Sequence, residues 1–402
     1  MYLTSKRPEE CTGCEACSHV CGKRAITMQD DGHGFRYPVI DEALCVHCGA
    51  CERVCPHEDK PQDSQAEQQY YAVCHRDDGV VRSSSSGGMV TLLAEEIFAR
   101  GGVMYGVAYG EGFRVAHTRA ESVEEAQAFR SSKYAQSDIA PLYDALRQDL
   151  QAGRTVLVTG TPCQIAGVKA WLKQQRADTS RLYTCDNICH GVASPAVLAD
   201  YLDSLKKYIP EGDEIAMVNM RYKDKPGETR MEIRTRQNAP VPETKAYSFD
   251  RLYRSCLLTR PACFACRYTC YERQGDITVG DFWNQKPSDC GFETAWGVSE
   301  VLVSTDKGRE LFEAVRARAH VVEVSREKAW QPHLEYATQK PKRYDAFWAD
   351  YAQAQEKEQV LRGYQKASPL IRVIRLVTPV LRKTGLYALC GRLYQKVFAR
   401  KK

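Results

Sequence analysis

The sequence predicts a multidomain α+β protein, with a small cysteine-dense domain first, a mixed α/β body next and a helical basic tail at the end. Three observations support this prediction. The chain has 402 residues, which is enough for two or three domains that each bury a core. Eight of its 18 cysteines fall between Cys11 and Cys55. Strand-like and helix-like segments alternate from residue 70 to about residue 340, and the residues after 361 are basic.

Composition excludes several classes of protein. Charged residues make up 27% of the chain and hydrophobic residues 43%, which is typical of a globular protein and not of a disordered one. No apolar run reaches the length of a membrane span, and the N-terminus lacks the apolar segment of a signal peptide. We therefore expect a cytoplasmic protein whose cysteines bind metal and do not form disulfides.

The first domain, residues 1–60, contains the run C-x2-C-x2-C-x3-C twice. In this pattern three thiolates from one run and one thiolate from the other meet at a [4Fe–4S] cluster. The spacing thus predicts two clusters, held by Cys11, Cys14, Cys17 and Cys55, and by Cys45, Cys48, Cys51 and Cys21. Zinc is the alternative, but zinc sites usually show two C-x2-C pairs. The domain resembles a bacterial two-cluster ferredoxin, and each run contains one glycine, Gly13 or Gly49.

A linker and the α/β body follow. Residues 61–69 are polar and begin with proline, so we expect a linker there. We divide the body into residues 70–150 and 151–343. Periodicity predicts strands at 70–75, 102–109, 113–119, 155–160, 182–188, 276–283 and 298–304, and helices at 89–100 and 161–175.

Several turns of the body hold candidate binding residues. Four serines and two glycines at 83–88 precede a helix, whose free N–H groups could bind phosphate; a polar N-cap loop is the alternative. Cys163 opens another helix and could be a reactive thiolate, a metal ligand or a buried residue. Cys189 follows a further strand, and Cys263 and Cys266 form a C-x2-C pair. Together these cysteines supply the four thiols that a third [4Fe–4S] cluster needs.

Six sequence blocks, in order, make the body similar to a known family. They are SSSSGGMVTLL, RSSKYAQSD, VLVTGTPCQIAGVK, ICHGVASP, RPACFACRYTC and DITVGDFW. With the ferredoxin module in front of them, they resemble the coenzyme F420 hydrogenase/dehydrogenase beta-subunit family over about residues 70–305. The resemblance implies a flavin- and cluster-binding α/β domain with FAD near Ser85, Ser86, Gly87, Gly88, Lys133, Tyr134 and Gln136. It also implies a third [4Fe–4S] cluster on Cys163, Cys189, Cys263 and Cys266.

The resemblance implies an iron–sulfur flavoprotein oxidoreductase. Single electrons from a ferredoxin or another one-electron donor pass through the clusters to FAD and on to an unidentified substrate. The bacterial members with an N-terminal ferredoxin imply a link to polysaccharide biosynthesis. The alternative is a non-catalytic electron-transfer subunit of a hydrogenase/dehydrogenase-type complex, including one that reduces coenzyme F420. His190 and Asp281 are the candidate catalytic residues, and a structural hydrogen bond is the other role open to His190.

The tail, residues 344–402, is predicted to be helical and strongly basic. Residues 362–402 contain eleven Lys and Arg and no acidic residue, so the rest of the chain has 45 basic against 51 acidic side chains. Because the basic excess is one terminal segment, we expect no nucleic-acid binding. Apolar and basic residues alternate in 366–402. This pattern suits either contact with the inner face of an anionic membrane or docking on the acidic body.

Overall fold

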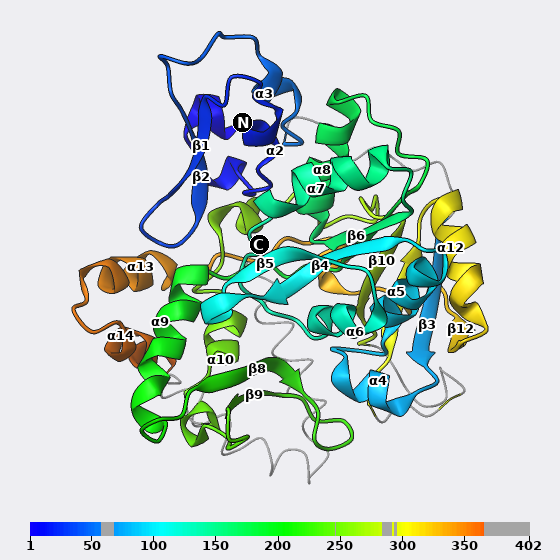
Figure 1. Ribbon diagram of the computed structural model, residues 1–402. Coiled ribbons are helices and arrows are strands. Elements are labelled where there is room, and N and C mark those ends of the chain that lie inside the picture. Colours follow the sequence, from blue (N-terminus) through cyan, green and yellow to red (C-terminus); the bar gives the residue numbers. More distant parts are fainter. Residues whose placement is uncertain (58–67, 246, 284–291, 293–295, 366–402) are drawn as a thin grey trace.

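The computed structural model describes residues 1–57, 68–245, 247–283, 292 and 296–365 (Figure 1). The described residues form a small N-terminal domain, a large sheet with helices on both faces, and a region of helices and a hairpin beside it. The predicted α+β class is therefore confirmed. The predicted linker lies outside the described residues, except for Gln68 and for Gln69, which already begins the first strand of the large sheet.

In the N-terminal domain the two cysteine runs flank a β-hairpin. Its antiparallel strands are β1 (Ile26–Asp30) and β2 (Arg36–Ile40), and the helices around them are α1 (Tyr2–Ser5), α2 (Ala16–Val20) and α3 (Ala50–Arg53). Gly13 has a φ of 71° and Gly49 a φ of 69°, in the left-handed region that favours glycine. The equivalent of Gly13 in the second run is His47, and that of Gly49 in the first run is Glu15. These two residues also have positive φ, 49° and 63°, so the two halves of the repeat turn in the same way before their helices.

The large sheet has eight strands in the order β12-β3-β11-β10-β7-β6-β4-β5. They are β3 (Gln69–His75), β4 (Val103–Tyr109), β5 (Val115–Ala120), β6 (Val156–Gly160), β7 (Leu182–Asn187), β10 (Ile277–Asp281), β11 (Ser299–Val303) and β12 (Ala319–Glu323). Strands β4, β6, β7 and β10 run parallel, and the other neighbours are antiparallel. Since parallel strands end at the same edge, the segments that follow β6, β7 and β10 meet there, where ligands usually bind in such sheets.

Alternate residues of the strands pack on opposite faces of the sheet. Val156 and Val158 of β6 face α7 (Ala140–Gln151) and α8 (Pro162–Gln174), whereas Leu157 between them packs with α5 (Met89–Ala99) and α12 (Asp306–Arg316). This is the period of two that a strand covered on both faces requires. The short helices α4 (Asp78–Ser83) and α6 (Val123–Ala126) complete this part. All strands and helices predicted between residues 70 and 304 are present, with boundaries shifted by a few residues.

A third core lies beside the sheet and contains the start of the predicted tail (Figure 1). It joins the hairpin β8 (Ile215–Tyr222) and β9 (Arg230–Thr235) to α9 (Pro195–Leu205), α10 (Phe249–Arg254), α13 (Tyr344–Gln353) and α14 (Lys357–Gln365). Residues 366–402, where we predict membrane or body contact, lie outside the described residues. No helix in the described part of the chain combines the length and the apolarity needed to cross a bilayer.

The N-terminal domain packs into the core formed by α7 and α8. Ala16 is 0% exposed and Val54 is 1% exposed, and both belong to that core. Trp171 of α8 donates a hydrogen bond from Nε1 to the carbonyl of His19 over 3.3 Å. The hydroxyl of Tyr143 on α7 donates to the carbonyl of Cys14 over 2.5 Å. These contacts fix which cysteines of the domain face the body.

Candidate functional site

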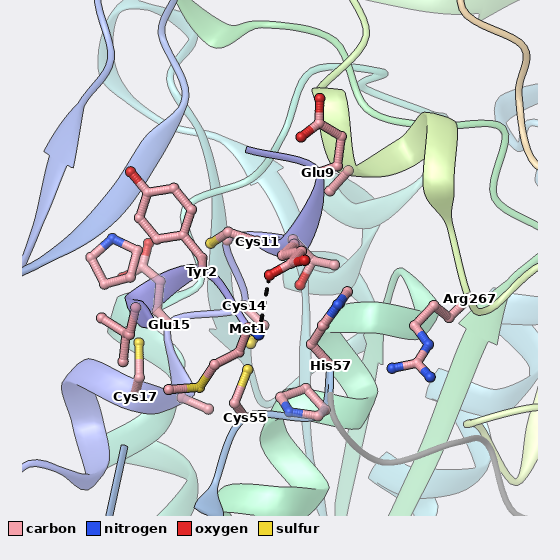
Figure 2. Close-up of a pocket in the computed structure, with 18 of the residues that line it drawn as sticks. Met1, Tyr2, Glu9, Cys11, Cys14, Glu15, Cys17, Cys55, His57 and Arg267 are labelled. Carbon is pink, nitrogen blue, oxygen red and sulfur yellow. Dashed lines mark ion pairs between the residues drawn. The ribbon is translucent and has the colours of Figure 1, made fainter. Parts of the chain in front are cut away.

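The thiols predicted to hold the first cluster gather around one cavity between the N-terminal domain and the body (Figure 2). They are those of Cys11, Cys14, Cys17 and Cys55. Burial raises the pKa of Cys17 well above its ordinary value, and the charges of the other three thiols raise it further. Such charge effects need short separations. Buried thiols that repel each other's charge form thiolates when a metal compensates them, so the group fits the predicted cluster.

The second group of predicted cluster ligands lies nearer the surface. Burial raises the pKa of Cys51, and the charge of Cys21 contributes to this shift. Cys48 is exposed. The structure therefore brings Cys51 and Cys21 together, whereas the assignment of Cys45 and Cys48 to the second cluster rests on their place in the repeat.

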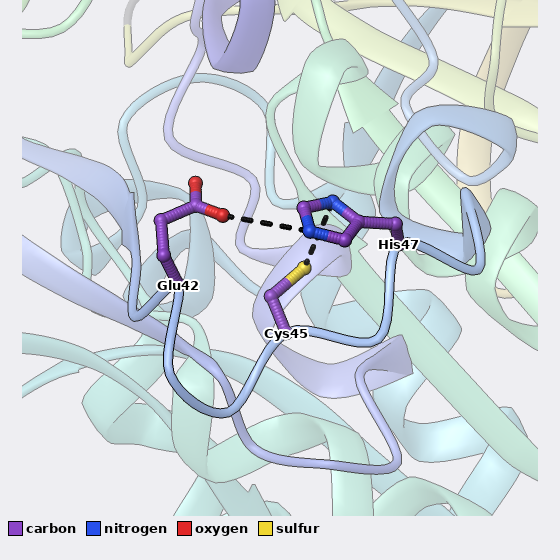
Figure 3. Close-up of side chains that lie close together, drawn as sticks. All are labelled: Glu42, Cys45 and His47. Carbon is purple, nitrogen blue, oxygen red and sulfur yellow. Dashed lines mark hydrogen bonds and ion pairs between the residues drawn. The ribbon is translucent and has the colours of Figure 1, made fainter.

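Cys45 also belongs to a small surface triad with Glu42 and His47 (Figure 3). The Cys45 sulfur lies 3.8 Å from His47 Nδ1, and His47 Nε2 lies 3.9 Å from a Glu42 carboxylate oxygen. The side chains of His47 and Glu42 are 78% and 72% exposed, so water competes with any ion for them. We assign no separate metal site to this triad.

The four thiols predicted for the third cluster converge, although they come from three separate segments. Cys163 lies in the first turn of α8 after β6, Cys189 follows β7, and Cys263 and Cys266 lie at the short 3-10 helix Pro261–Ala265. Burial raises the pKa of Cys189 well above its ordinary value, and the charges of the other three thiols add to the shift. Burial likewise raises the pKa of Cys266 to about 11, with Cys163 contributing. This mutual influence is what four ligands of one cluster require.

A buried ion pair supports the segment that carries two of these thiols. Arg273 and Asp186 lie 3.4 Å apart and have side chains that are 1% and 0% exposed. Arg273 also donates to the carbonyls of Tyr268, Cys270 and Asn187. Because Asp186 is on β7, this network ties the segment after Cys266 to the strand that precedes Cys189. Removal of one partner of such a pair leaves a buried charge without compensation, which is strongly destabilising.

The first and third thiol groups adjoin each other through α8. Gly167 lies one turn after Cys163, and a Cβ atom there would stand 2.7 Å from the Cβ of Cys14 and 2.8 Å from its sulfur. Burial raises the pKa of Cys14, and the charges of Cys55, Cys11 and Cys163 raise it further. The hydroxyl of Tyr268 donates to the carbonyl of Pro56, the residue after Cys55, over 3.3 Å. The absence of a side chain at Gly167 thus allows the close approach of the two groups.

A large cleft opens at the edge of the sheet where the parallel strands end. Its volume is about 1060 Å³, slightly above the range of roughly 300–1,000 Å³ that is usual for ligand pockets. The segments after β6 and β7, the end of β10 and the N-terminal turn of α5 line it. Cys189 of the third thiol group forms part of the wall. The cleft therefore offers a helix N-terminus and adjoining thiols to the same ligand, which suits a phosphate-bearing redox cofactor.

The serine-rich turn predicted near FAD lines this cleft in part. Ser85, Ser86 and Gly88 are on its wall. The Ser85 hydroxyl accepts from the backbone N–H of Ser132 over 2.8 Å, and that of Ser86 donates to the carbonyl just before β11 over 2.5 Å. Gly87 instead packs on the sheet, since a Cβ atom there would stand 2.2 Å from a carbonyl of β3. The hydroxyls of Ser85 and Ser86 thus attach the turn to the segments on both sides of the cleft.

The other predicted FAD neighbours differ in position. Lys133 lines the cleft, but its ammonium donates to three carbonyls of its own loop, and burial lowers its pKa to about 7. Tyr134 also lines the cleft and stacks on Tyr253 with ring centroids 4.2 Å apart. Gln136 faces the N-terminal domain, where its side-chain amide donates to the carbonyl of Thr12 over 3.0 Å. The structure therefore brings Lys133 and Tyr134 to the cleft and directs Gln136 to the first thiol group.

The two candidate catalytic residues, His190 and Asp281, line the cleft. The ring of His190 stacks on that of His333 with centroids 4.0 Å apart, and burial lowers the pKa of His190 to about 4. Asp281 forms an ion pair with Arg221 over 2.7 Å. Arg221 and His333 have no motif around them in the sequence, and only the fold shows that they belong to the cleft.

The fold and the thiol groups define a class, a protein with an iron–sulfur dicluster domain in front of a cysteine-bearing α/β body. Residues 10–58 match the 4Fe-4S dicluster domain family. Residues 153–328 match the family described as the C terminus of the coenzyme F420 hydrogenase/dehydrogenase beta subunit. The resemblance predicted from the sequence is confirmed for these two segments: one matches a dicluster ferredoxin-type domain, and the other matches the C terminus of this beta-subunit family.

The similarity is illustrated by two relatives and by a chain of a solved structure. A subunit of the F(420)H(2) dehydrogenase from Methanosarcina mazei is 22% identical over 337 residues, which are 78% of this chain and 84% of the relative. The coenzyme F420-dependent sulfite reductase from Methanocaldococcus jannaschii is 28% identical over 167 residues, which are 40% of this chain and only 24% of that longer relative. A chain of the F420-reducing [NiFe] hydrogenase complex from Methanosarcina barkeri has a TM-score of 0.44 and 18% identity, covering 64% of this chain and 82% of that one.

Proposed function

We propose that this protein is an iron–sulfur electron-transfer subunit of a hydrogenase- or dehydrogenase-type oxidoreductase. The approach of Cys14 to α8, one turn from Cys163, carries the proposal, because it puts the ferredoxin-type domain against the thiol group beside the cleft. The name of one relative, a dehydrogenase subunit, favours this subunit role over an enzyme that acts alone on its own substrate. The match to the other relative, a sulfite reductase, covers only 24% of that protein. The names of the two relatives give no support to a link with polysaccharide biosynthesis.

The proposal assigns three tasks to the chain. Bound iron–sulfur clusters exchange single electrons, and a bound flavin would pair them. The twelve predicted cysteine ligands hold three clusters in a row. The second cluster lies nearest the surface, the first cluster follows, and the third cluster lies beside the cleft. Gly167 and Tyr268 keep the first and third thiol groups adjacent. The N-terminal turn of α5 and the serine turn before it receive the anionic part of FAD in the cleft.

The surface around Cys48 suits a protein partner. Cys48 is exposed, and so are Leu44 and Val46, with exposed fractions of 51% and 58%. Apolar side chains next to a predicted cluster ligand offer a contact surface for a one-electron donor such as a ferredoxin. The electron path that we propose begins at this second group and ends at the cleft.

Cofactor content tests the proposal. Because each predicted cluster contains four irons and four sulfides, anaerobically purified protein should contain about twelve of each per chain. Denaturation should release about one FAD. Trials with reduced ferredoxin, deazaflavin and nicotinamide donors then identify the electron source. Stoichiometric zinc without acid-labile sulfide would contradict the cluster assignment, and a fully iron-loaded protein that binds no added FAD would remove the flavin from the proposal.

Charge at the start of α5 tests the flavin site itself. Val90 lines the cleft in the first helical turn. A Val90→Glu substitution favours the helix but opposes an anionic cofactor at its N-terminus, so FAD should bind roughly five- to thirtyfold more weakly, or about 1–2 kcal/mol. Val90→Gln has the same length without the charge and is the reference. Titration of flavin-free protein by fluorescence measures the difference, which should shrink at high salt. Equal affinities of the two variants for FAD would show that the phosphates of the cofactor do not bind at the N-terminus of α5.

A further inference from the structure

Arg260 is a buried cation between the N-terminal domain and the third thiol group. It is 1% exposed and lies three residues before Cys263. Its guanidinium crosses to the N-terminal domain, where Nε donates to the carbonyl of Cys11 over 2.8 Å. Its Nη2 lies 3.6 Å from the sulfur of Cys11 and donates to it. Arg260 thus contacts both the backbone carbonyl and the sulfur of Cys11, a predicted ligand of the first cluster.

The guanidinium is held in this orientation by neutral groups. Nη1 donates to the side-chain oxygen of Gln136 over 2.8 Å, and Nη2 donates to the carbonyl of Arg36 over 2.9 Å. The ring centroid of Tyr37 lies 4.4 Å from Cζ. All three nitrogens of the guanidinium donate to these partners, so its charge is fixed in place before any electron arrives.

Among the nearby groups that can carry negative charge, the sulfur of Cys11 accepts a hydrogen bond from Arg260 directly. Glu15 also lies near this cation: burial raises the pKa of Glu15 to about 7, and the charges of Arg36 and Arg260 act against that shift. However, the carboxylate of Glu15 pairs with Arg36 over 2.5 Å. The positive charge of Arg260 is therefore available to the thiol groups on either side of it.

We propose that Arg260 is a tuning residue that raises the reduction potential of the cluster on Cys11, Cys14, Cys17 and Cys55. Reduction of this cluster takes one electron from an external one-electron donor and adds one negative charge to the cluster and its thiolates, while the protein makes and breaks no bond. A fixed cation in a dry site stabilises that added charge. The N–H to sulfur hydrogen bond acts in the same direction, since such bonds and net charge set cluster potentials. The inference rests on the cluster proposed at Cys11.

Potentiometric titration of the full chain, followed by electron paramagnetic resonance, tests the proposal. Arg260→Gln removes the charge, so reduction of the first cluster should become at least tenfold less favourable, which is about 59 mV more negative for one electron. Arg260→Lys keeps the charge without the fork and should shift the potential less. Arg114→Gln is the control, because Arg114 lies at the same junction with its side chain 69% exposed. An iron-loaded Arg260→Gln protein with an unchanged potential would show that Arg260 is only structural.

A measurement on the unsubstituted protein keeps the proposal testable if the variants do not fold. The chain is labelled with guanidinium-15N arginine and reduced with dithionite, and pulsed electron paramagnetic resonance then looks for 15N coupling to the reduced cluster. We expect a coupling, and its absence in protein with full cluster signals would overturn the inference. Iron and sulfide counts separate this failure from that of the proposed function, which would instead leave no cluster at Cys11.

Discussion

A Cys189→Ser substitution should remove about four of about twelve iron atoms and leave the two N-terminal clusters intact. The thiol of Cys189 is buried among the three other thiols of its group, and a serine hydroxyl is a poor ligand for iron where a soft thiolate is needed. Because Cys14 approaches Cys163, loss of this centre also cuts the path from the N-terminal domain to the cleft. Reduction of bound flavin by a ferredoxin-type donor should therefore be lost.

Iron analysis, electron paramagnetic resonance and donor-dependent bleaching of the flavin measure these effects together. Cys270→Ser is the matched control, because Cys270 lies four residues after Cys266 and its sulfur contacts the backbone carbonyls of Arg267 and Glu272. It should retain all of the iron. If Cys270→Ser removed the third cluster and Cys189→Ser did not, the ligand assignment would be wrong.

A Gly167→Ala substitution should disturb the first cluster, although it adds only one methyl group and residue 167 is far from the N-terminal cysteines in the sequence. The new Cβ would stand 2.7 Å from the Cβ of Cys14, and 2.8 Å from its sulfur, so Cys14 or α8 has to move. Overpacking of this kind costs roughly 1–3 kcal/mol. We expect a lower iron content, up to a loss of about four atoms, and slower electron transfer to the cleft.

Gly363→Ala provides the matched control for this experiment. Gly363 is also a helical glycine, on α14, and no heavy atom of the described residues lies within 4 Å of the position that its Cβ would take. Both substitutions gain the same helix propensity, about 1 kcal/mol, so the difference between them isolates the contact with Cys14. Equal melting temperatures and equal iron contents in the two variants would show that α8 does not fix the first thiol group.

The cysteine groups could be predicted because cluster chemistry imposes a spacing on the sequence. The repeat indicates which thiols share a cluster, and the family resemblance implies which distant cysteines join them. The direction of a side chain is different, since it depends on tertiary contacts. Gln136 lies two residues after Tyr134, yet it contacts the carbonyl of Thr12 in the N-terminal domain and not the cleft. Arg260 is indistinguishable from a surface arginine in the sequence, although it is 1% exposed.

Strands could be predicted where most of their residues are apolar. They could not be predicted where the pattern of apolar residues is weak. Strands β6 and β11 consist mainly of buried apolar residues, which is typical of strands covered on both faces, and both were expected. In β8 only Val218 and Met220 are buried, and the polar residue Asn219 stands between them. Nothing in that segment distinguishes a strand from a loop until α9 and α10 supply the core on which it packs.

The burial of Ala16 and Val54 against α7 and α8 has a consequence for how the protein is made. The N-terminal domain leaves the ribosome first, but the residues that complete its core are translated about a hundred positions later. Until then its cysteine loops lack the surface that positions Cys14, through Tyr143 and Gly167. We therefore expect iron to enter the first centre only after synthesis of α8, so that maturation of the domain waits for the body.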